Sequence, residues 1–244
     1  ELLDDVEKYT FVERAKRGGL CMITQRGVEA NNEYLEQYDP EAPTSYIRYL
    51  DANNLYGWAM SQPLPLCDFV FEEPRGDVEE WVAHIQEGDW MGSSGAFFEV
   101  TLDYPEEIHD AHYDFPLAPD NIKAEKALLS PFSRSLLDKY VATKKLIPHL
   151  GPRVRYVCHA ATLQLYLQEG MRLREVHKVL RFQQSCWLKG WIDHNTNLRA
   201  AATSEFARDF FKLANNSVFG KSMEDVRNRT VCHLVTTRKQ FIKK

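Results

Sequence analysis

The sequence has few cysteines and none of the spacings that bind zinc. The five (Cys21, Cys67, Cys158, Cys186 and Cys232) are odd in number, far apart, and form no Cys-x-x-Cys pair. This excludes a disulfide framework and a thiolate zinc site and indicates a reducing, intracellular compartment. No apolar run approaches the roughly 20 residues that cross a bilayer, and Glu1–Asp5 lack the basic start of a signal peptide. We therefore expect an intracellular protein that is not secreted and has no membrane partner.

The sequence also lacks the familiar catalytic signatures. It contains no Gly-x-Gly-x-x-Gly, Walker lysine loop, nucleophile elbow or His-Glu-x-x-His. His109 and His112 are spaced by one helical turn, but no third ligand is evident, so a metal site is not predicted there. With 44% hydrophobic and 27% charged residues, the composition is that of a folded chain.

The distribution of charge is more informative than its total of −5. Residues 1–122 carry 7 Lys and Arg against 26 Asp and Glu, a formal charge of −19, whereas residues 123–244 carry 23 against 9, a formal charge of +14. A basic half of this size is typical of a surface that binds a polyanion, because Lys and Arg displace counterions from phosphates. The alternative is that both halves are solvated surface.

Hydrophobic periodicity and turn residues predict helices and strands without a regular βαβ alternation. Helices are predicted at 6–16, 78–86 and 162–169, a short helix after a turn at 52–60, and a helical pair or one bent helix at 195–223. Strands are predicted at 46–50, 96–102, 155–158 and 176–182. This order favours an α+β fold with an appended helical piece.

The predicted helix around residues 204–221 has two different faces. Arg208, Lys212, Asn216 and Phe219 fall within roughly 80° of one another at 100° per residue. Such a stripe suits a nucleoside triphosphate, with cations for the phosphates and a ring for stacking. The opposite side is predicted to face the core, and it consists of Phe206, Phe210, Leu213, Ala214, Ser217 and Val218. The alternative is a solvated basic face with one aromatic residue.

Asp51 stands at the end of the predicted strand at 46–50, just before a turn. A hard cation such as Mg²⁺ takes oxygen ligands, which here would be the carboxylate and the carbonyl of Ala52. The alternative is that Asp51 is a helix N-cap, a position that aspartate favours.

Two separate segments together resemble a known family. Asp51-Ala52-Asn53-Asn54-Leu55-Tyr56 and Lys212-Leu213-Ala214-Asn215-Asn216-Ser217-Val218-Phe219-Gly220 resemble the first two polymerase motifs of family B DNA polymerases, Asp-x-x-Ser-Leu-Tyr and Lys-x-x-x-Asn-Ser-x-Tyr-Gly. Arg17-Gly18-Gly19 resembles the Tyr-x-Gly-Gly linker of that family. Nearly the whole chain resembles the protein-primed branch, and most of all the polymerases of Maverick/Polinton-type transposons and of related viral and organellar elements.

The resemblance implies a polymerase palm with an antiparallel sheet, an insertion region and helical fingers. The implied parts are a pre-palm linker segment (1–45), palm motif A (46–66), palm strands with an insertion that contacts the terminal protein and duplex (67–187), fingers with motif B (188–223), and the start of the following region (224–244). Implied partners are a DNA primer-template, dNTPs and a terminal protein, with Mg²⁺ or Mn²⁺ as cofactor. The implied location is the nucleus or a viral replication site.

The resemblance also implies roles for individual residues. Asp51, Tyr56, Lys212 and Asn216 would be catalytic, and Asp51 would be the metal ligand. Nucleotide binding would involve Ala52, Tyr56, Arg208, Lys212, Asn216 and Phe219, with the Tyr56 ring excluding a 2′-hydroxyl. DNA binding would involve Arg17, Gly18, Gly19, Gly220 and Lys221.

The sequence departs from the family pattern at several points. Asn54 replaces Ser, Phe219 replaces Tyr, Lys16 replaces the linker Tyr, and no Asp-Thr-Asp follows Gly220. The Lys-x-Tyr motif and the exonuclease domain are also missing. Because one carboxylate does not hold two magnesium ions, we expect this stretch of chain to be an incomplete catalytic region that does not polymerise DNA by itself. The alternative is a non-catalytic, nucleic-acid-binding remnant of a mobile element.

Overall fold

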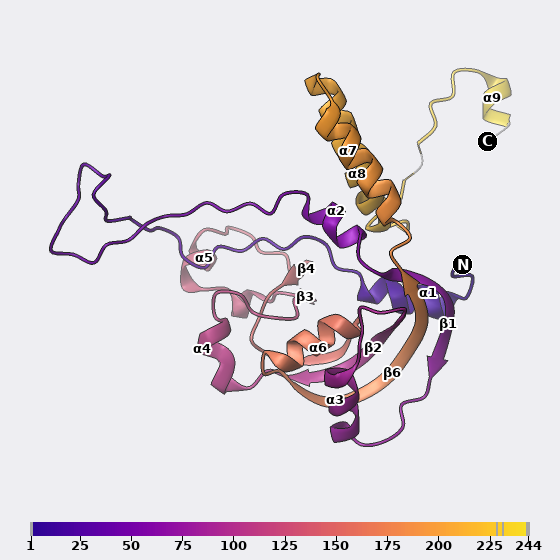
Figure 1. The fold of residues 1–244 in the computed structure, drawn as a ribbon, viewed down its shortest axis with the longest axis horizontal. Helices are drawn as coiled ribbons and strands as arrows, with labels where there is room; N and C mark the ends of the chain where they lie inside the picture. Colours follow the sequence, from indigo (N-terminus) through magenta and orange to yellow (C-terminus); the bar gives the residue numbers. More distant parts are fainter. Residues whose placement is uncertain (1, 228, 231, 243–244) are drawn as a thin grey trace.

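The computed structural model is a mixed α and β fold built on an antiparallel sheet, and it describes residues 2–227, 229–230 and 232–242 (Figure 1). The strands are β1 (Leu64–Glu72), β2 (Ser94–Asp103), β3 (Asp120–Lys123), β4 (Lys144–Ile147), β5 (Arg153–His159) and β6 (Arg172–Ser185). The α-helices are α1 (Val6–Ala15), α2 (Leu55–Met60), α3 (Val78–Glu87), α4 (His109–His112), α5 (Pro131–Ser135), α6 (Ala160–Gln168), α7 (Lys189–Ala201), α8 (Glu205–Ser222) and α9 (Arg238–Ile242). No helix in these residues is long and apolar enough to cross a membrane.

The main sheet has the strand order β1-β6-β2-β5, and every neighbouring pair is antiparallel. Strands β3 and β4 form a separate two-stranded hairpin. Side chains alternate across the main sheet: Phe98 and Val100 face one hydrophobic core, and Phe97 faces the other. Helices α3 and α6 cover the first face, and α1 covers the second through Phe11. The sheet therefore separates two surfaces with different helical covers.

The predicted strands at 96–102, 155–158 and 176–182 and the predicted helices at 6–16, 78–86 and 162–169 are all confirmed. The prediction of a helical pair or one bent helix at 195–223 resolves into two helices, α7 and α8. Gly170 closes α6 with φ at +94°, a conformation that glycine adopts without steric cost.

The predicted strand at 46–50 is wrong. These residues have no regular structure, and the exposed fractions of Tyr49 and Leu50 are 93% and 86%. A strand needs a neighbouring strand to complete its hydrogen bonds, and within the described residues none lies beside this segment. Asp51 therefore does not stand at the end of a palm strand, and β1, which the sequence did not predict, supplies the edge of the sheet instead.

The predicted core face of α8 is also wrong. Phe206, Phe210 and Leu213 are 82%, 56% and 66% exposed. Helices α7 and α8 form a hairpin that projects from the sheet, and α8 packs mainly against α7 and α2 (Figure 1). Only the seam of the hairpin is buried, and there Asn215 Nδ2 donates to the carbonyl of Ile192 at 3.4 Å. The outward face of α8 meets no sheet, so its aromatic residues remain in solvent.

A half-buried histidine joins the sheet to α6. His159 is the N-cap of α6, and its Nδ1 accepts a hydrogen bond from the Ala161 amide at 3.1 Å. The proton is therefore on Nε2, which donates to Gln184 Oε1 at 3.2 Å. Burial lowers the pKa of His159 below its ordinary value of 6.5, although the hydrogen bond to Gln184 opposes this shift.

We expect His159 to make the stability of the protein depend on pH. Because its pKa is lower in the folded than in the unfolded chain, its contribution is complete above about pH 6.5 and is lost as the pH falls through the folded-state value. His159→Asn retains an N-cap acceptor and is expected to flatten the fall in unfolding free energy between about pH 7 and pH 5. Urea unfolding across this range measures both curves, and parallel curves would contradict the prediction.

Candidate nucleotide and DNA site

The two segments that carry the polymerase-like motifs meet in the structure. The rings of Tyr56, on α2, and Phe219, on α8, are stacked with centroids 4.2 Å apart and planes inclined by 9°. Helix α2 also contacts α7 and α8 elsewhere along its length. The Tyr56 side chain is still 43% exposed, so part of its ring remains open to a ligand.

The turn before α2 has a compact geometry that sets the position of Tyr56. Asn54 is the N-cap residue with φ at +54°, and its carbonyl accepts the Trp58 amide at 2.9 Å. Gly57 is buried against Asn54, and a Cβ atom at Gly57 would lie 2.4 Å from the side-chain Nδ2 of Asn54. The N-cap is thus Asn54 and not Asp51, so the alternative role for Asp51 as the cap of α2 is wrong.

The polar stripe predicted on α8 is present in part. Lys212 is exposed and has no ion pair or hydrogen bond with any residue in the described ranges. Arg208 is exposed as well, with its Nε donating to the carbonyl of Ala202 at 3.0 Å. Asn216 and Phe219 are half-buried. Within the described residues, Lys212 is therefore a cation of the stripe with no polar partner, and Arg208 keeps its charge uncompensated as well.

Asp51 lies in the exposed, irregular segment before α2. Within the described part of the chain, no hydrogen bond or ion pair joins it to Lys212 or Arg208, and no group of three His, Cys, Asp or Glu side chains is placed to hold a metal. A two-ion site needs more carboxylates than Asp51 supplies. These residues do not fit such a site, although the carboxylate of Asp51 is exposed.

The Arg17-Gly18-Gly19 linker lies against the C-terminal end of α8. Lys16 Nζ donates to the carbonyl of Ser222 at 2.9 Å, and a Cβ atom added at Gly18 would come within 3.9 Å of Met223 Cε. The structure therefore brings the linker next to Gly220 and Lys221, two further residues predicted to bind DNA. The sequence alone does not reveal this proximity, because about 200 residues separate the two segments.

Arg17 itself is held by the protein. Its guanidinium donates to the carbonyls of Val157 at 2.7 Å, Ala15 at 2.9 Å and Pro119 at 3.2 Å, and it lies 3.9 Å from the centroid of the Tyr156 ring. These contacts occupy most of its donors. In this conformation Arg17 positions the linker on the sheet, and the glycines that follow it are the exposed part.

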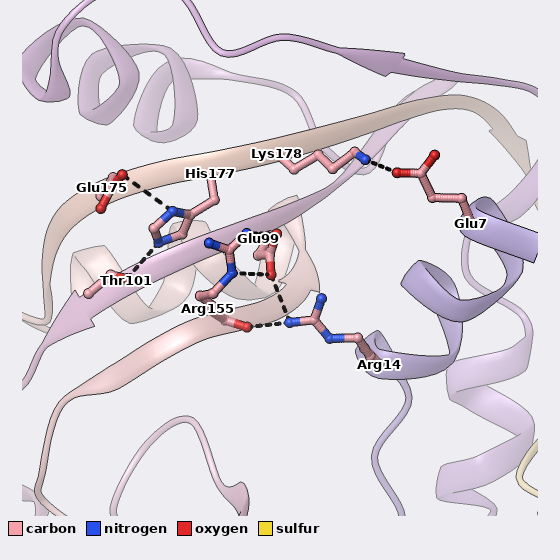
Figure 2. A network of polar contacts seen from close by, with 8 residues as sticks. All are labelled: Glu7, Arg14, Glu99, Thr101, Arg155, Glu175, His177 and Lys178. Atoms are coloured by element: carbon pink, nitrogen blue, oxygen red, sulfur yellow. Dashed lines mark hydrogen bonds and ion pairs between the residues drawn. The ribbon is translucent and has the colours of Figure 1, made fainter.

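A polar network fixes the helix from which the linker departs (Figure 2). Glu99 on β2 is 3% exposed and accepts from Arg14 Nη2 at 2.8 Å and from Arg155 Nε at 3.1 Å. Burial alone would raise the pKa of Glu99, but hydrogen bonds and charges from the two arginines outweigh it and hold the pKa below its ordinary value. A third ion pair, between Lys178 and Glu7, ties the start of α1 to β6.

A cleft of about 880 Å³ opens beside the linker. Six cations line it, namely Arg14, Lys16, Arg17, Lys144, Arg155 and Arg227, together with four carboxylates, namely Glu13, Asp120, Glu224 and Asp225. Lys144 is exposed on β4 and has no ion pair with another described residue. Sequence motifs gave no sign of Lys144, and the only available signal was the basic excess of residues 123–244.

No protein-family model matches the sequence, and no curated protein matches it either. Among solved structures, the chain is similar to phi29 DNA polymerase in an orthorhombic crystal form, with a TM-score of 0.48 and 16% identity over 91% of this chain and 32% of that one. It is also similar to phi29 DNA polymerase in a ternary complex with primer-template DNA and incoming nucleotide substrates, with a TM-score of 0.41 and 20% identity over 70% of this chain and 25% of that one. The chain thus spans about a third of the polymerase at most.

Proposed function

We propose that this chain is the palm-and-fingers region of a protein-primed family B DNA polymerase and that it binds a deoxynucleoside triphosphate and DNA. The observation that carries the proposal is the Tyr56–Phe219 stack, because it joins two motif-like segments that are distant in sequence. If the two segments did not share a site, we would not expect a partly exposed tyrosine of α2 to stack against the face of α8 that carries Lys212.

The proposed nucleotide site lies between α2 and α8. Lys212 and Arg208 would bind the triphosphate, with Asn216 beside them, and the backbone of Ala52 and the carboxylate of Asp51 would bind its Mg²⁺ or Mn²⁺. The exposed part of the Tyr56 ring would lie beneath the sugar and exclude a 2′-hydroxyl, with Phe219 as its support. Template-directed transfer of a nucleotide would further require carboxylates beyond Asp51.

The proposed DNA path follows the linker. Gly18 and Gly19 permit close approach of a phosphate backbone, and Gly220 and Lys221 stand at the adjacent end of α8. The segment 67–187 would include the insertion that contacts the terminal protein and the duplex, and its β3–β4 hairpin contains Lys123, Lys144 and Lys145. Such a polymerase of a transposon or virus would act at a nuclear or viral replication site.

We expect dATP binding to depend on Mg²⁺ through Asp51. Asp51→Asn is expected to remove the increase in dATP affinity that Mg²⁺ gives, about tenfold or 1.4 kcal/mol, because an amide is a much weaker ligand for a hard cation than a carboxylate. Titration of a fluorescent dATP analogue with and without Mg²⁺ measures this. Asp114→Asn, in an exposed loop, is the matched control. An Mg²⁺ effect of equal size in both variants would overturn the role of Asp51.

One observation favours a second candidate, a non-catalytic nucleic-acid-binding protein. The formal charge of +14 in residues 123–244 suits a polyanion without any nucleotide site. That protein would bind single-stranded DNA with strong salt dependence and would not respond to dATP, Mg²⁺ or Asp51→Asn. The titration above therefore separates the two candidates.

A further inference from the structure

An apolar groove runs between α3 and α6, on the face of the sheet opposite α1. Its volume is about 490 Å³, within the range of about 300–1,000 Å³ that is usual for binding pockets. Val78, Val82 and Ala83 of α3 form one wall, and the buried side chains of Leu167, Met171 and Leu173 form the floor. A second hollow of about 380 Å³ continues from it, since Val78 and Glu79 line both.

The rim of this groove is acidic. Two carboxylates, Glu79 and Glu87, line the groove, and Asp77 and Glu175 line the hollow that continues from it. Glu79 and Glu87 are both exposed. Arg172 also lines it, but its charge is neutralised by Glu107 at 2.7 Å. The field over the groove is therefore negative.

The apolar floor and the acidic rim together argue against a nucleic acid as the ligand of the groove and favour a cationic protein segment. Phosphates would be repelled by the rim, whereas the floor offers contacts only to apolar side chains. An apolar groove beside a helix is a usual receptor for an amphipathic helix, which inserts residues at i, i+3 or i+4 and i+7. Lys or Arg at the edges of that helix would face Glu79 and Glu87.

We propose that the α3–α6 groove is a docking site for an amphipathic helical segment of another protein, with apolar anchors in the groove and Lys or Arg against the acidic rim. The cleft beside the linker is lined by residues of α1, β5 and the β3–β4 hairpin and shares no residue with the groove, so a protein bound in the groove leaves the proposed DNA path open. The proposal does not depend on the proposed polymerase function.

The test uses a fluorescein-labelled amphipathic Leu/Lys peptide of about 18 residues, long enough to form a helix, and a Leu/Glu peptide of the same pattern. We expect the Leu/Lys peptide to bind the full chain in an anisotropy titration and the Leu/Glu peptide not to bind. Ala83→Arg fills the groove and adds a cation, and Glu87→Lys reverses one rim charge. Each is expected to weaken binding about tenfold, as loss of a central contact does.

Matched variants separate docking from general attraction to an acidic protein. Ala200→Arg, at an exposed position of α7, and Glu36→Lys, in the exposed loop, make the same chemical changes away from the groove and are expected to bind like the wild type. All four positions are exposed, and circular dichroism checks that each variant is folded. Equal weakening by groove and control variants, equal binding of both peptides, or no binding would each overturn the proposal.

Discussion

Replacing Arg153 by methionine is expected to lower the free energy of unfolding by about 3 kcal/mol, a large share of the 5–15 kcal/mol usual for a domain. Arg153 is fully buried, and its guanidinium donates to the carbonyls of Leu117 at 2.9 Å and His149 at 2.7 Å and to those of Ala118 and Gly151. Among the described residues no carboxylate lies within ion-pair distance of it, although the charge of Asp120 acts on it from farther away. Methionine fills much of the volume but leaves these carbonyls without donors.

Two opposing contributions determine whether Arg153→Met raises or lowers the free energy of unfolding. Removing Arg153 abolishes the cost of burying a cation, which favours the variant. The Ala118 carbonyl is buried and costs about 1–3 kcal/mol when it is left unsatisfied. The carbonyls of Leu117, His149 and Gly151 are partly buried and each add a smaller cost, so the loss prevails. These carbonyls belong to the segments before β3 and after β4, so Arg153 holds both ends of the β3–β4 hairpin against β5.

Urea unfolding monitored by circular dichroism measures the change. Arg174→Met is the control, because Arg174 is 63% exposed and pairs with Asp103 at the surface, so its loss is expected to cost at most about 1 kcal/mol. Hydrogen exchange is expected to show faster exchange in β3 and β4 in Arg153→Met. A loss no larger than that of Arg174→Met would contradict the prediction.

Hydrophobic patterns in the sequence correctly predicted the helices and strands that pack against nearby segments or are completely buried. The run around Phe97 and Phe98 alternates between two buried faces, and that alternation is visible in the sequence. Strand β1 was missed because Pro63 and Pro65 suggested the end of regular structure. Since β1 pairs only with β6, at the edge of the sheet, it tolerates a proline.

The wrong predictions have a common physical cause: the structure of these segments depends on residues that are distant in the sequence. Residues 46–50 have the composition of a strand but no strand beside them, and the apolar residues of α8 have helical spacing but no sheet to cover them. For the candidate site, sequence motifs named Tyr56 and Phe219 separately. Only the structure shows that their rings touch and that the linker lies against the end of α8.

The second large effect is expected at Lys212. Its ammonium group is exposed on α8 and has no anionic partner in the described structure, so its charge is free to bind a triphosphate. Lys212→Glu removes a charge-assisted hydrogen bond worth about 1.5–3 kcal/mol and adds repulsion between two anions. We therefore expect the affinity for dATP with Mg²⁺ to fall about a hundredfold, which corresponds to roughly 2.8 kcal/mol.

A graded series shows whether charge at Lys212 or general electrostatics produces this loss. Lys212→Gln removes the charge without adding repulsion and is expected to lose about tenfold, between wild type and Lys212→Glu. Lys189→Glu makes the same reversal on the neighbouring helix, where Lys189 pairs with Asp193 at 2.7 Å, and is expected to bind dATP like the wild type. Equal losses at Lys189 and Lys212 would mean that net charge, and not a site on α8, attracts the nucleotide. Losses confined to Lys212 would place the phosphates against the stripe that Phe219 and Tyr56 complete.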